Sequence, residues 1–174
     1  MRPRQPLPRL WLMTDVRMGE ALWTALDRLP RGAGVVFRHY QLSAKERAAL
    51  FAQVRQIARR RRLVLLVAGA PLPGADGRHG PRTRGGRGLA TRPAHHRREL
   101  IAAQRAGVDA VFASPVFATR SHPGAAALGR VRFGLMVRDS AVPVIALGGM
   151  NARRAEGLAR FGIHGWAAID AWAR

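Results

Sequence analysis

The fold is decided by one stretch of the sequence, Val142-Pro-Val-Ile-Ala-Leu-Gly-Gly-Met-Asn-Ala-Arg153. Its apolar run from Val142 to Leu147 predicts a buried strand, Gly148-Gly149 allows the backbone to turn without a Cβ, and Asn151 can cap a following helix. Glycines directly before a helix start leave backbone N–H groups that suit a phosphate. The stretch therefore predicts a strand, a glycine turn able to cradle phosphate and a helix, with a purely structural tight turn as the alternative.

Similar units recur along the rest of the chain. Apolar runs predict buried strands, and runs with apolar residues at helical spacing predict helices between them. The predicted strands are 10–15, 34–40, 63–67, 109–114, 142–147 and 164–170, with two weak strands near 74–77 and 87–91; the predicted helices are 19–29, 43–60, 99–107, 131–138 and 152–160. This alternation favours a parallel sheet closed into a (β/α)₈ TIM-type barrel, with an open doubly wound sheet as the alternative.

The barrel is expected to be abbreviated. Its 174 residues are few, because about 200 to 250 residues is the usual size of such a barrel. Residues 68–93 are rich in glycine, proline and arginine and lack an amphipathic run, so we expect the third and fourth helices to be shortened or missing. If the barrel does not close here, the exposed edge of the sheet needs a partner chain. A second copy of the chain, in a homodimer, would supply that partner.

Composition predicts a single domain spanning 1–174, with residues 1–9 as a flexible basic tail. The chain has no cysteine, which excludes disulfides and thiolate metal sites. Leu10–Met13 is too short to be the apolar part of a secretory signal, and no run approaches the about 18 apolar residues of a membrane span. We therefore expect a cytoplasmic protein that does not enter a membrane.

The chain is strongly basic, with 30 Lys+Arg against 10 Asp+Glu and a formal net charge of +20. Such a charge attracts phosphorylated metabolites and polyanions. The arginines are scattered over every segment, aromatic content is 6%, and no nucleic-acid recognition motif is present. We therefore expect a phosphorylated small molecule as the ligand rather than nucleic acid.

Six short motifs in order resemble thiamine phosphate synthase and its TenI-like relatives. They are Leu12-Met-Thr-Asp15, Arg38 with Leu42-Ser-Ala-Lys-Glu46, Gly74-Ala-Asp-Gly-Arg-His79, Ser114-Pro-Val-Phe-Ala-Thr119, Ile145-Ala-Leu-Gly-Gly-Met150 and Gly162-Ile-His-Gly-Trp-Ala-Ala-Ile169. The resemblance covers nearly the whole chain and is weakest between Ala68 and Pro93.

The resemblance implies a transferase of thiamine biosynthesis that joins hydroxymethylpyrimidine diphosphate to thiazole phosphate and releases pyrophosphate, with Mg²⁺ as cofactor. By position, it implies that Arg38 contacts pyrophosphate. It likewise implies that Thr119 and Ser121 meet the thiazole phosphate, and that Gly148 and Gly149 form its backbone cradle.

Other positions depart from the family's pattern. Its lysine two places after the arginine is Tyr40, its Asn-Asp pair falls on Ala68-Gly69, its next acidic residue falls among Pro81, Arg82 and Thr83, its loop lysine is His122, and its last serine is Asp170. Mg²⁺ usually needs one or two carboxylates besides phosphates. We therefore expect no metal site held by the protein, and no His and acid spacing suggests zinc.

The acids and histidines suggest a replacement site. Asp15 and Asp170 lie at the carboxyl ends of the first and last predicted strands. These strands are neighbours in a closed barrel, so we expect the two acids to meet at its mouth with Arg38 or His39 beside them. A plain salt bridge from Asp170 to Arg38 is the alternative. His122 is a candidate acid and base, or a solvated loop residue.

The remaining histidines are given structural places. His95 and His96 precede a helix and are interpreted as cap or surface groups, and His79 and His164 as residues of the barrel base.

Three functions stay open at this stage. The first is a divergent thiamine phosphate synthase with Arg38 and His122 as its catalytic residues. The second is a TenI-like paralogue, either a thiazole tautomerase or a phosphate-ligand binder, which would tolerate the lost lysine and Mg²⁺ positions. The third is a non-catalytic anion-binding protein.

Overall fold

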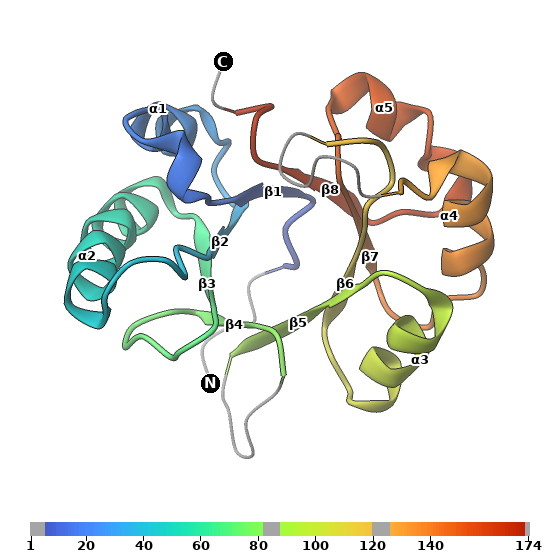
Figure 1. Cartoon of the computed structure of the whole chain (residues 1–174), viewed down its shortest axis with the longest axis horizontal. Coiled ribbons are helices and arrows are strands. Elements are labelled where there is room, and N and C mark those ends of the chain that lie inside the picture. Colours follow the sequence, from blue (N-terminus) through green and yellow to red (C-terminus); the bar gives the residue numbers. More distant parts are fainter. Residues whose placement is uncertain (1–5, 82–87, 120–125, 173–174) are drawn as a thin grey trace.

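Eight parallel strands form a closed barrel in chain order in the computed structural model, which describes residues 6–81, 88–119 and 126–172 (Figure 1). The strands are β1 (Leu10–Met13), β2 (Gly34–Phe37), β3 (Val64–Ala68), β4 (Gly77–His79), β5 (Leu89–Ala94), β6 (Ala110–Ala113), β7 (Val144–Leu147) and β8 (Gly165–Ala168). The helices described are α1 (Ala21–Arg28), α2 (Ala44–Arg61), α3 (Arg97–Arg105), α4 (Gly129–Val137) and α5 (Ala152–Glu156), with the 3₁₀ helices η1 (Val16–Met18) and η2 (Ala159–Phe161).

The barrel closes because β1 pairs with a strand on each side. Trp11 is in register with Gly34 of β2 and with Ala167 of β8. The expected TIM-type barrel is confirmed, and the open doubly wound sheet is wrong. Since the described sheet has no open edge, the edge argument for a homodimer no longer applies.

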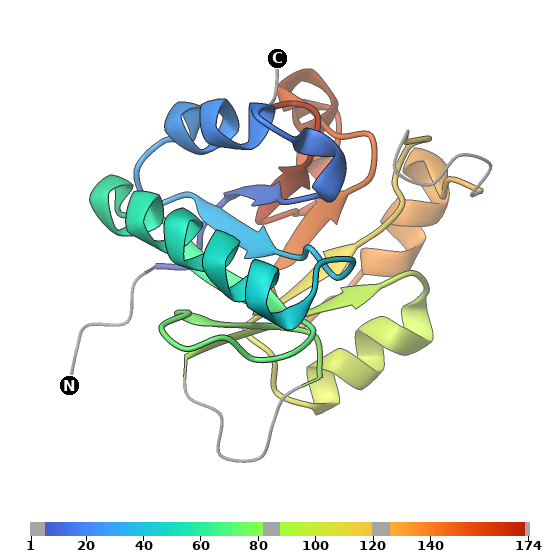
Figure 2. The ribbon, with the colours of Figure 1, turned by 60° about the vertical axis from the view of Figure 1, so that its left-hand side comes forward.

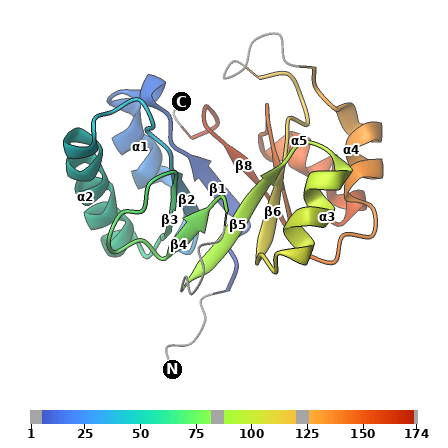
Figure 3. The same ribbon diagram turned by 60° about the horizontal axis from the view of Figure 1, so that its bottom comes forward.

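The helices cover two sides of the barrel and leave a third side thin. Helices α1 and α2 pack outside β1 to β3, and α3, α4 and α5 lie beside the later strands (Figures 1 and 3). Residues 69–76, which join β3 to β4, contain no helix. Between β4 and β5 only Gly80, Pro81 and Gly88 are described, and none of them is helical. The expectation of shortened or missing third and fourth helices therefore holds for the described residues.

Arginines hold the segment that stands where the third helix would be. Arg47 of α2 donates through Nη2 to the carbonyl of Ala68, at 2.6 Å, and through Nη1 to that of Ala70, at 3.0 Å. Arg78 donates to the carbonyl of Gly69 at 2.9 Å, and Arg55 to that of Pro73 at 3.1 Å. The segment runs beside α2 (Figure 2). These guanidinium groups supply donors that a helix would have supplied from its own backbone.

Two aromatic rings fill the middle of the barrel. The Trp11 and Phe112 rings meet edge to face with centroids 5.2 Å apart, and both side chains are fully buried. Gly34 is required opposite Trp11, because a Cβ there would lie 2.1 Å from the indole ring. His79 stands against the same Phe112 ring at 4.9 Å. The interior of the barrel is therefore packed, and space opens only toward the strand ends.

Residues 7–9, which the sequence assigns to a basic tail, lie against the barrel. The Leu7 carbonyl lies 3.0 Å from His164 Nε2, and the Arg9 carbonyl accepts a hydrogen bond from Trp166 N–H at 2.8 Å. The expected place of His164 at the base is confirmed. Residues 1–5 of the predicted tail lie outside the described residues. Among the helices of the described residues, none is long and apolar enough to cross a membrane.

Replacing Arg47 tests how the helix-free segment is held. Arg47→Met keeps most of the side chain that packs on Phe37, where the guanidinium lies 5.5 Å from the ring centroid, but removes both donors. The buried carbonyl of Ala68 then lacks this donor, so we expect about 1–3 kcal/mol lower free energy of unfolding by urea denaturation. Arg60 is exposed on the same helix, and Arg60→Met should change the free energy of unfolding by less than about 0.5 kcal/mol. Equal effects of the two variants would contradict this account.

Candidate functional site

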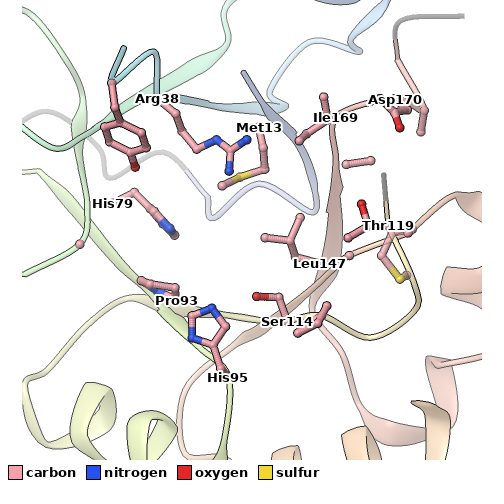
Figure 4. A pocket seen from close by; sticks show the side chains of 18 of the residues that line it. Met13, Arg38, His79, Pro93, His95, Ser114, Thr119, Leu147, Ile169 and Asp170 are labelled. Atoms are coloured by element: carbon pink, nitrogen blue, oxygen red, sulfur yellow. The ribbon is translucent and has the colours of Figure 1, made fainter. Parts of the chain in front are cut away.

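A cavity of about 570 Å³ opens at the carboxyl ends of the strands (Figure 4). Residues at the ends of six strands line it, namely Met13, Arg38, His79, Ser114, Leu147 and Ala168. The carboxyl end of such a barrel is where ligands bind, because the loops after the strands meet there. A cavity of this size suits a small molecule.

Arg38 is held rigidly at one side of this cavity. Its Nε donates to the Thr14 carbonyl at 2.9 Å, its Nη2 donates to Asp15 Oδ2 at 2.9 Å, and its backbone N–H donates to Thr14 Oγ1 at 3.0 Å. The side chains of Arg38 and Asp15 are each 18% exposed. The guanidinium is therefore a fixed cation facing the cavity, which suits an anionic ligand.

Asp15 serves mainly to hold arginines. Besides Arg38, it accepts hydrogen bonds from the N–H and Nε of Arg17, at 3.1 and 2.8 Å. Burial alone would raise the pKa of Asp15, but the hydrogen bonds from Arg17 and the charges of Arg17 and Arg38 outweigh it and lower the pKa. Asp15 is thus a carboxylate that orients Arg38 from outside the cavity lining.

Asp170 lies at the cavity, after β8 (Figure 4). A hydrogen bond to Asp15 is the main factor that raises the pKa of Arg17, and the charge of Asp170 raises it further. The two acids expected to form a replacement site therefore act on a common arginine. His39 is not part of the described cavity lining: its Nδ1 lies 3.0 Å from Thr14 Oγ1 and its ring stacks on Phe37. Arg38, expected beside the two acids, forms its ion pair with Asp15; a salt bridge from Asp170 to Arg38 was the alternative interpretation of the sequence.

The glycine turn forms another side of the cavity and is fixed by the loop after β6. Gly148 and Gly149 have φ values of +98° and +60°. A Cβ on Gly148 would lie 2.8 Å from Pro115 Cα, and one on Gly149 would lie 2.5 Å from the Ala118 carbonyl oxygen. Glycine is therefore required at both positions by backbone conformation and by close packing.

Hydrogen bonds join the same turn and loop. Val116 N–H donates to the Leu147 carbonyl at 2.9 Å, and Phe117 N–H donates to the Gly148 carbonyl at 3.1 Å. Asn151 caps α5 as expected, since its side chain accepts from the N–H of Arg154 at 2.9 Å. Thr119, at the end of the described part of the loop, lines the same cavity. The structure thus brings Thr119, Gly148 and Gly149 together, while Ser121 and His122 lie outside the described residues.

His79 is a cavity residue that the sequence interpretation placed wrongly at the barrel base. It is the last residue of β4, it is 7% exposed, and its Nδ1 lies 2.9 Å from Thr91 Oγ1. Burial, together with the charge of Arg38, lowers the pKa of His79 to about 4, so the ring is neutral near pH 7. The motif that begins at Gly74 could have placed His79 correctly, since a strand starting near Gly77 ends there.

His95 also lines the cavity, at its rim, while its Nδ1 lies 3.0 Å from Glu99 Oε2. His96 is the N-cap of α3 and accepts from the N–H of Glu99, as the interpretation of a cap residue expected. His95 therefore belongs both to the helix start and to the cavity.

The residues present do not fit a magnesium ion held by the protein. Of the described residues that line the cavity, Asp170 alone carries a carboxylate. The described chain contains no group of three or more His, Asp or Glu side chains able to hold a metal. Where the family would place an Asn-Asp pair, the carbonyls of Ala68 and Gly69 are bound by Arg47 and Arg78. Cations therefore occupy the surroundings in which a metal would need anions.

The lowered pKa of the buried His79 leads us to expect a loss of folding stability in acid. Its pKa is lowered to about 4 in the folded chain, against about 6.5 when unfolded. The neutral His79 ring contributes to the free energy of unfolding in full above pH 6.5. This contribution is lost as pH falls toward 4, because His79 of the unfolded chain binds its proton at a higher pH than His79 of the folded chain. Between about pH 7 and about pH 4.5, the unfolding free energy should fall by on the order of 2 kcal/mol more than in His79→Gln. Urea denaturation at several pH values measures this; parallel profiles for both proteins would contradict it.

Comparisons with known proteins point to one family. The family model described as thiamine monophosphate synthase matches residues 85–172, about half of the chain. A putative thiamine-phosphate synthase 2 from Aquifex aeolicus is 28% identical over 94% of this chain and 97% of its own length. A thiamine-phosphate synthase from Chloroflexus aurantiacus is 34% identical over 45% of this chain and 37% of its own length.

A solved structure has the same fold. The thiamine phosphate pyrophosphorylase from Pyrococcus furiosus superimposes with a TM-score of 0.77 and 23% identity, covering 95% of this chain and 88% of that one. The resemblance stated from the six sequence motifs is confirmed by these comparisons. Because the family model matches half of the chain, at residues 85–172, this chain belongs to the thiamine monophosphate synthase family.

Proposed function

We propose that this protein is a transferase that joins hydroxymethylpyrimidine diphosphate to thiazole phosphate and releases pyrophosphate. One observation carries the proposal: two elements suited to bind anions face a single cavity. Arg38 stands on one side and Thr119 on the other (Figure 4). The glycine turn also lines the cavity, and Gly149 packs against Ala118, the residue before Thr119. A reaction between two phosphorylated substrates needs two such places, whereas a reaction of one phosphorylated substrate needs one.

Arg38 supports the departure of pyrophosphate. When the bond between the pyrimidine methylene carbon and oxygen breaks, the electron pair leaves with pyrophosphate and negative charge builds on its oxygens. A cation held in advance stabilises that charge without having to reorganise. The hydrogen bonds from Arg38 to Thr14 and Asp15 supply this preorganisation. Asp15 is therefore a positioning residue, which acts through Arg38.

The glycine turn supports the second half of the reaction. Thiazole phosphate bound through Gly148, Gly149 and Thr119 would present its ring nitrogen toward the middle of the cavity. The nitrogen lone pair then forms the new carbon–nitrogen bond with the pyrimidine methylene cation. Holding both partners in one cavity makes the capture effectively unimolecular.

No step of this proposal passes through Mg²⁺, because the described cavity residues offer it one carboxylate, Asp170. Pyrophosphate departure would then rest on Arg38 and on the positive field of the chain, whose net charge is +20. We propose that any effect of Mg²⁺ comes from its association with the diphosphate in solution. His122, predicted as a second catalytic residue, stays a prediction.

The altered lysine and acid positions favour a second candidate function. Tyr40, Ala68 and Gly69 stand where the family's lysine and Asn-Asp pair would be. A TenI-like role, as a thiazole tautomerase or a binder of a phosphate ligand, would need the glycine turn and a proton shuttle but not a pyrophosphate site. Binding and turnover experiments separate the two functions.

Calorimetry with each substrate, with and without Mg²⁺, together with an assay for thiamine phosphate, tests the proposal. We expect both substrates to bind and product to form. Arg38→Gln should weaken binding of the pyrimidine diphosphate by about 10–100-fold, the effect of losing a charged hydrogen-bond donor, and leave binding of thiazole phosphate nearly unchanged. Gly149→Ala and Thr119→Val should weaken binding of thiazole phosphate and leave binding of the pyrimidine diphosphate nearly unchanged. Binding of thiazole phosphate alone would favour the TenI-like function, and binding of neither would contradict both.

A further inference from the structure

A second cavity, of about 590 Å³, lies on the outside of the barrel. It is a groove between α4 and η2, and the first residue of β7 forms part of it. The groove therefore stands at the amino end of β7, whereas the cavity described above opens at the carboxyl ends of the strands. Helix α4 lies at the edge of the molecule, between α3 and α5 (Figure 1). No step of the proposed reaction uses this groove.

Helix α4 carries apolar side chains where a surface helix normally presents polar ones. Its buried face consists of Phe133, Met136 and Val137. Val131 and Leu135 stand one turn apart outside this face and line the groove, and they are 72% and 60% exposed. A surface helix needs only one apolar face to pack on its core. The second apolar face of α4 is thus left uncovered by the described chain.

A glycine makes the floor of the groove. The Phe161 ring lies so close to α4 that a Cβ on Gly134 would be 2.5 Å from Phe161 Cε1. Because Gly134 has no side chain, the surface of the helix dips there, and the half-buried Phe161 lines the groove. Val142 and Val144 complete the apolar floor. A concave apolar floor beside exposed apolar side chains fits the side chains that project from one face of another helix.

Arginines surround this apolar groove. Arg138 and Arg160 line it, and Arg132 is exposed on the same helix. Residues 129–162 contain six arginines and two acids. One of these acids, Asp139, lies 3.6 Å from Arg138, but the two side chains are 78% and 74% exposed, so water weakens this pair. The rim is therefore positive and suits a negatively charged partner.

This charge decides among the possible occupants of the groove. A second copy of the chain has the same net charge of +20 and the same arginines, so two such grooves facing each other would repel. A flat lipid surface reaches exposed side chains but not a concave floor. A helix with one apolar face and acidic flanks matches both the apolar floor and the positive rim.

We propose that this groove is a docking site for an acidic amphipathic helix of a partner protein. The apolar face of that helix packs against Phe161 and Leu135, and its Asp and Glu side chains pair with Arg138 and Arg160. Because the groove and the strand-end cavity are at opposite ends of the strands, the partner can bind without covering the cavity. This inference goes beyond the proposed transferase function and does not depend on it.

Three synthetic peptides of about five helical turns test the proposal by calorimetry with the full chain. The first has leucines along one helical face and glutamates elsewhere. The second has the same composition with its leucines spread around the helix, and the third is the first with lysine in place of glutamate. We expect the first to bind about tenfold more tightly than the second, and less tightly as salt is added, while the third should not bind.

One pair of variants tests the apolar contact. Leu135→Asn removes a side chain that is already exposed, so the variant should fold, which circular dichroism checks. It should weaken binding of the first peptide by about tenfold, the effect of losing most of one leucine contact. Val16→Asn removes another exposed apolar side chain, outside the groove, and should leave binding unchanged.

A second pair of variants tests the charges of the rim. Arg138→Gln combined with Arg160→Gln should weaken binding of the first peptide by about three- to tenfold and reduce its dependence on salt. Arg59→Gln combined with Arg60→Gln removes the same charge from exposed positions on α2 and should have a smaller effect. Equal effects of the two double variants would show binding to the charge of the whole chain and would contradict a site at the groove.

Other outcomes would overturn the proposal as well. These are no binding of the first peptide, equal binding of the first and second peptides, or unchanged binding in Leu135→Asn. A dimer of the parent chain in sedimentation velocity that Leu135→Asn dissociates would assign the groove to a second copy. Binding to phosphatidylglycerol vesicles that Leu135→Asn abolishes would assign it to a lipid surface. Either result would contradict a partner helix.

Discussion

The pairing of β1 with both β2 and β8 is the constraint on which the rest of the structure depends. It closes the sheet, so that the carboxyl ends of strands far apart in sequence meet around one opening. The packing of Trp11 on Phe112, with Gly34 opposite the indole, fills the barrel below that opening. Because the centre is filled by large rings, the remaining space lies at the mouth, where loops supply the polar groups.

The sequence predicted the parts of this fold that have strong local signals. The apolar run before Gly148 is β7, and α2 overlaps the helix predicted over 43–60 and begins at a capping box of Ser43 and Glu46. Both signals depend on residues close together in the chain. β4 gives no such signal. It has three residues, two of them Arg78 and His79, and it is a strand because β3 and β5 pair with it. The weak strand predicted near 74–77 stops before His79, so this cavity residue was missed although part of its strand was predicted.

Composition could not show which arginines have a local role. The net charge of +20 is a property of the whole chain, but Arg47, Arg55 and Arg78 hydrogen-bond carbonyls beside the helix-free segment. Arg38 differs because Thr14 and Asp15 hold it at the cavity. That distinction depends on contacts across strands, which no spacing in the sequence reveals. The family's motif pointed to Arg38, and the geometry supplies a physical reason for the role that we propose for it.

The central claim is that one cavity holds two anion-binding places, at Arg38 and at the glycine turn. A crystal structure with thiazole phosphate and an unreactive methylene analogue of the pyrimidine diphosphate, both bound, measures this most directly. The account predicts the thiazole phosphate oxygens at hydrogen-bond distance from the backbone N–H groups around Gly148 and Gly149, and the diphosphate within reach of the Arg38 guanidinium. Both phosphate groups at the same place, or either ligand outside the cavity, would contradict it.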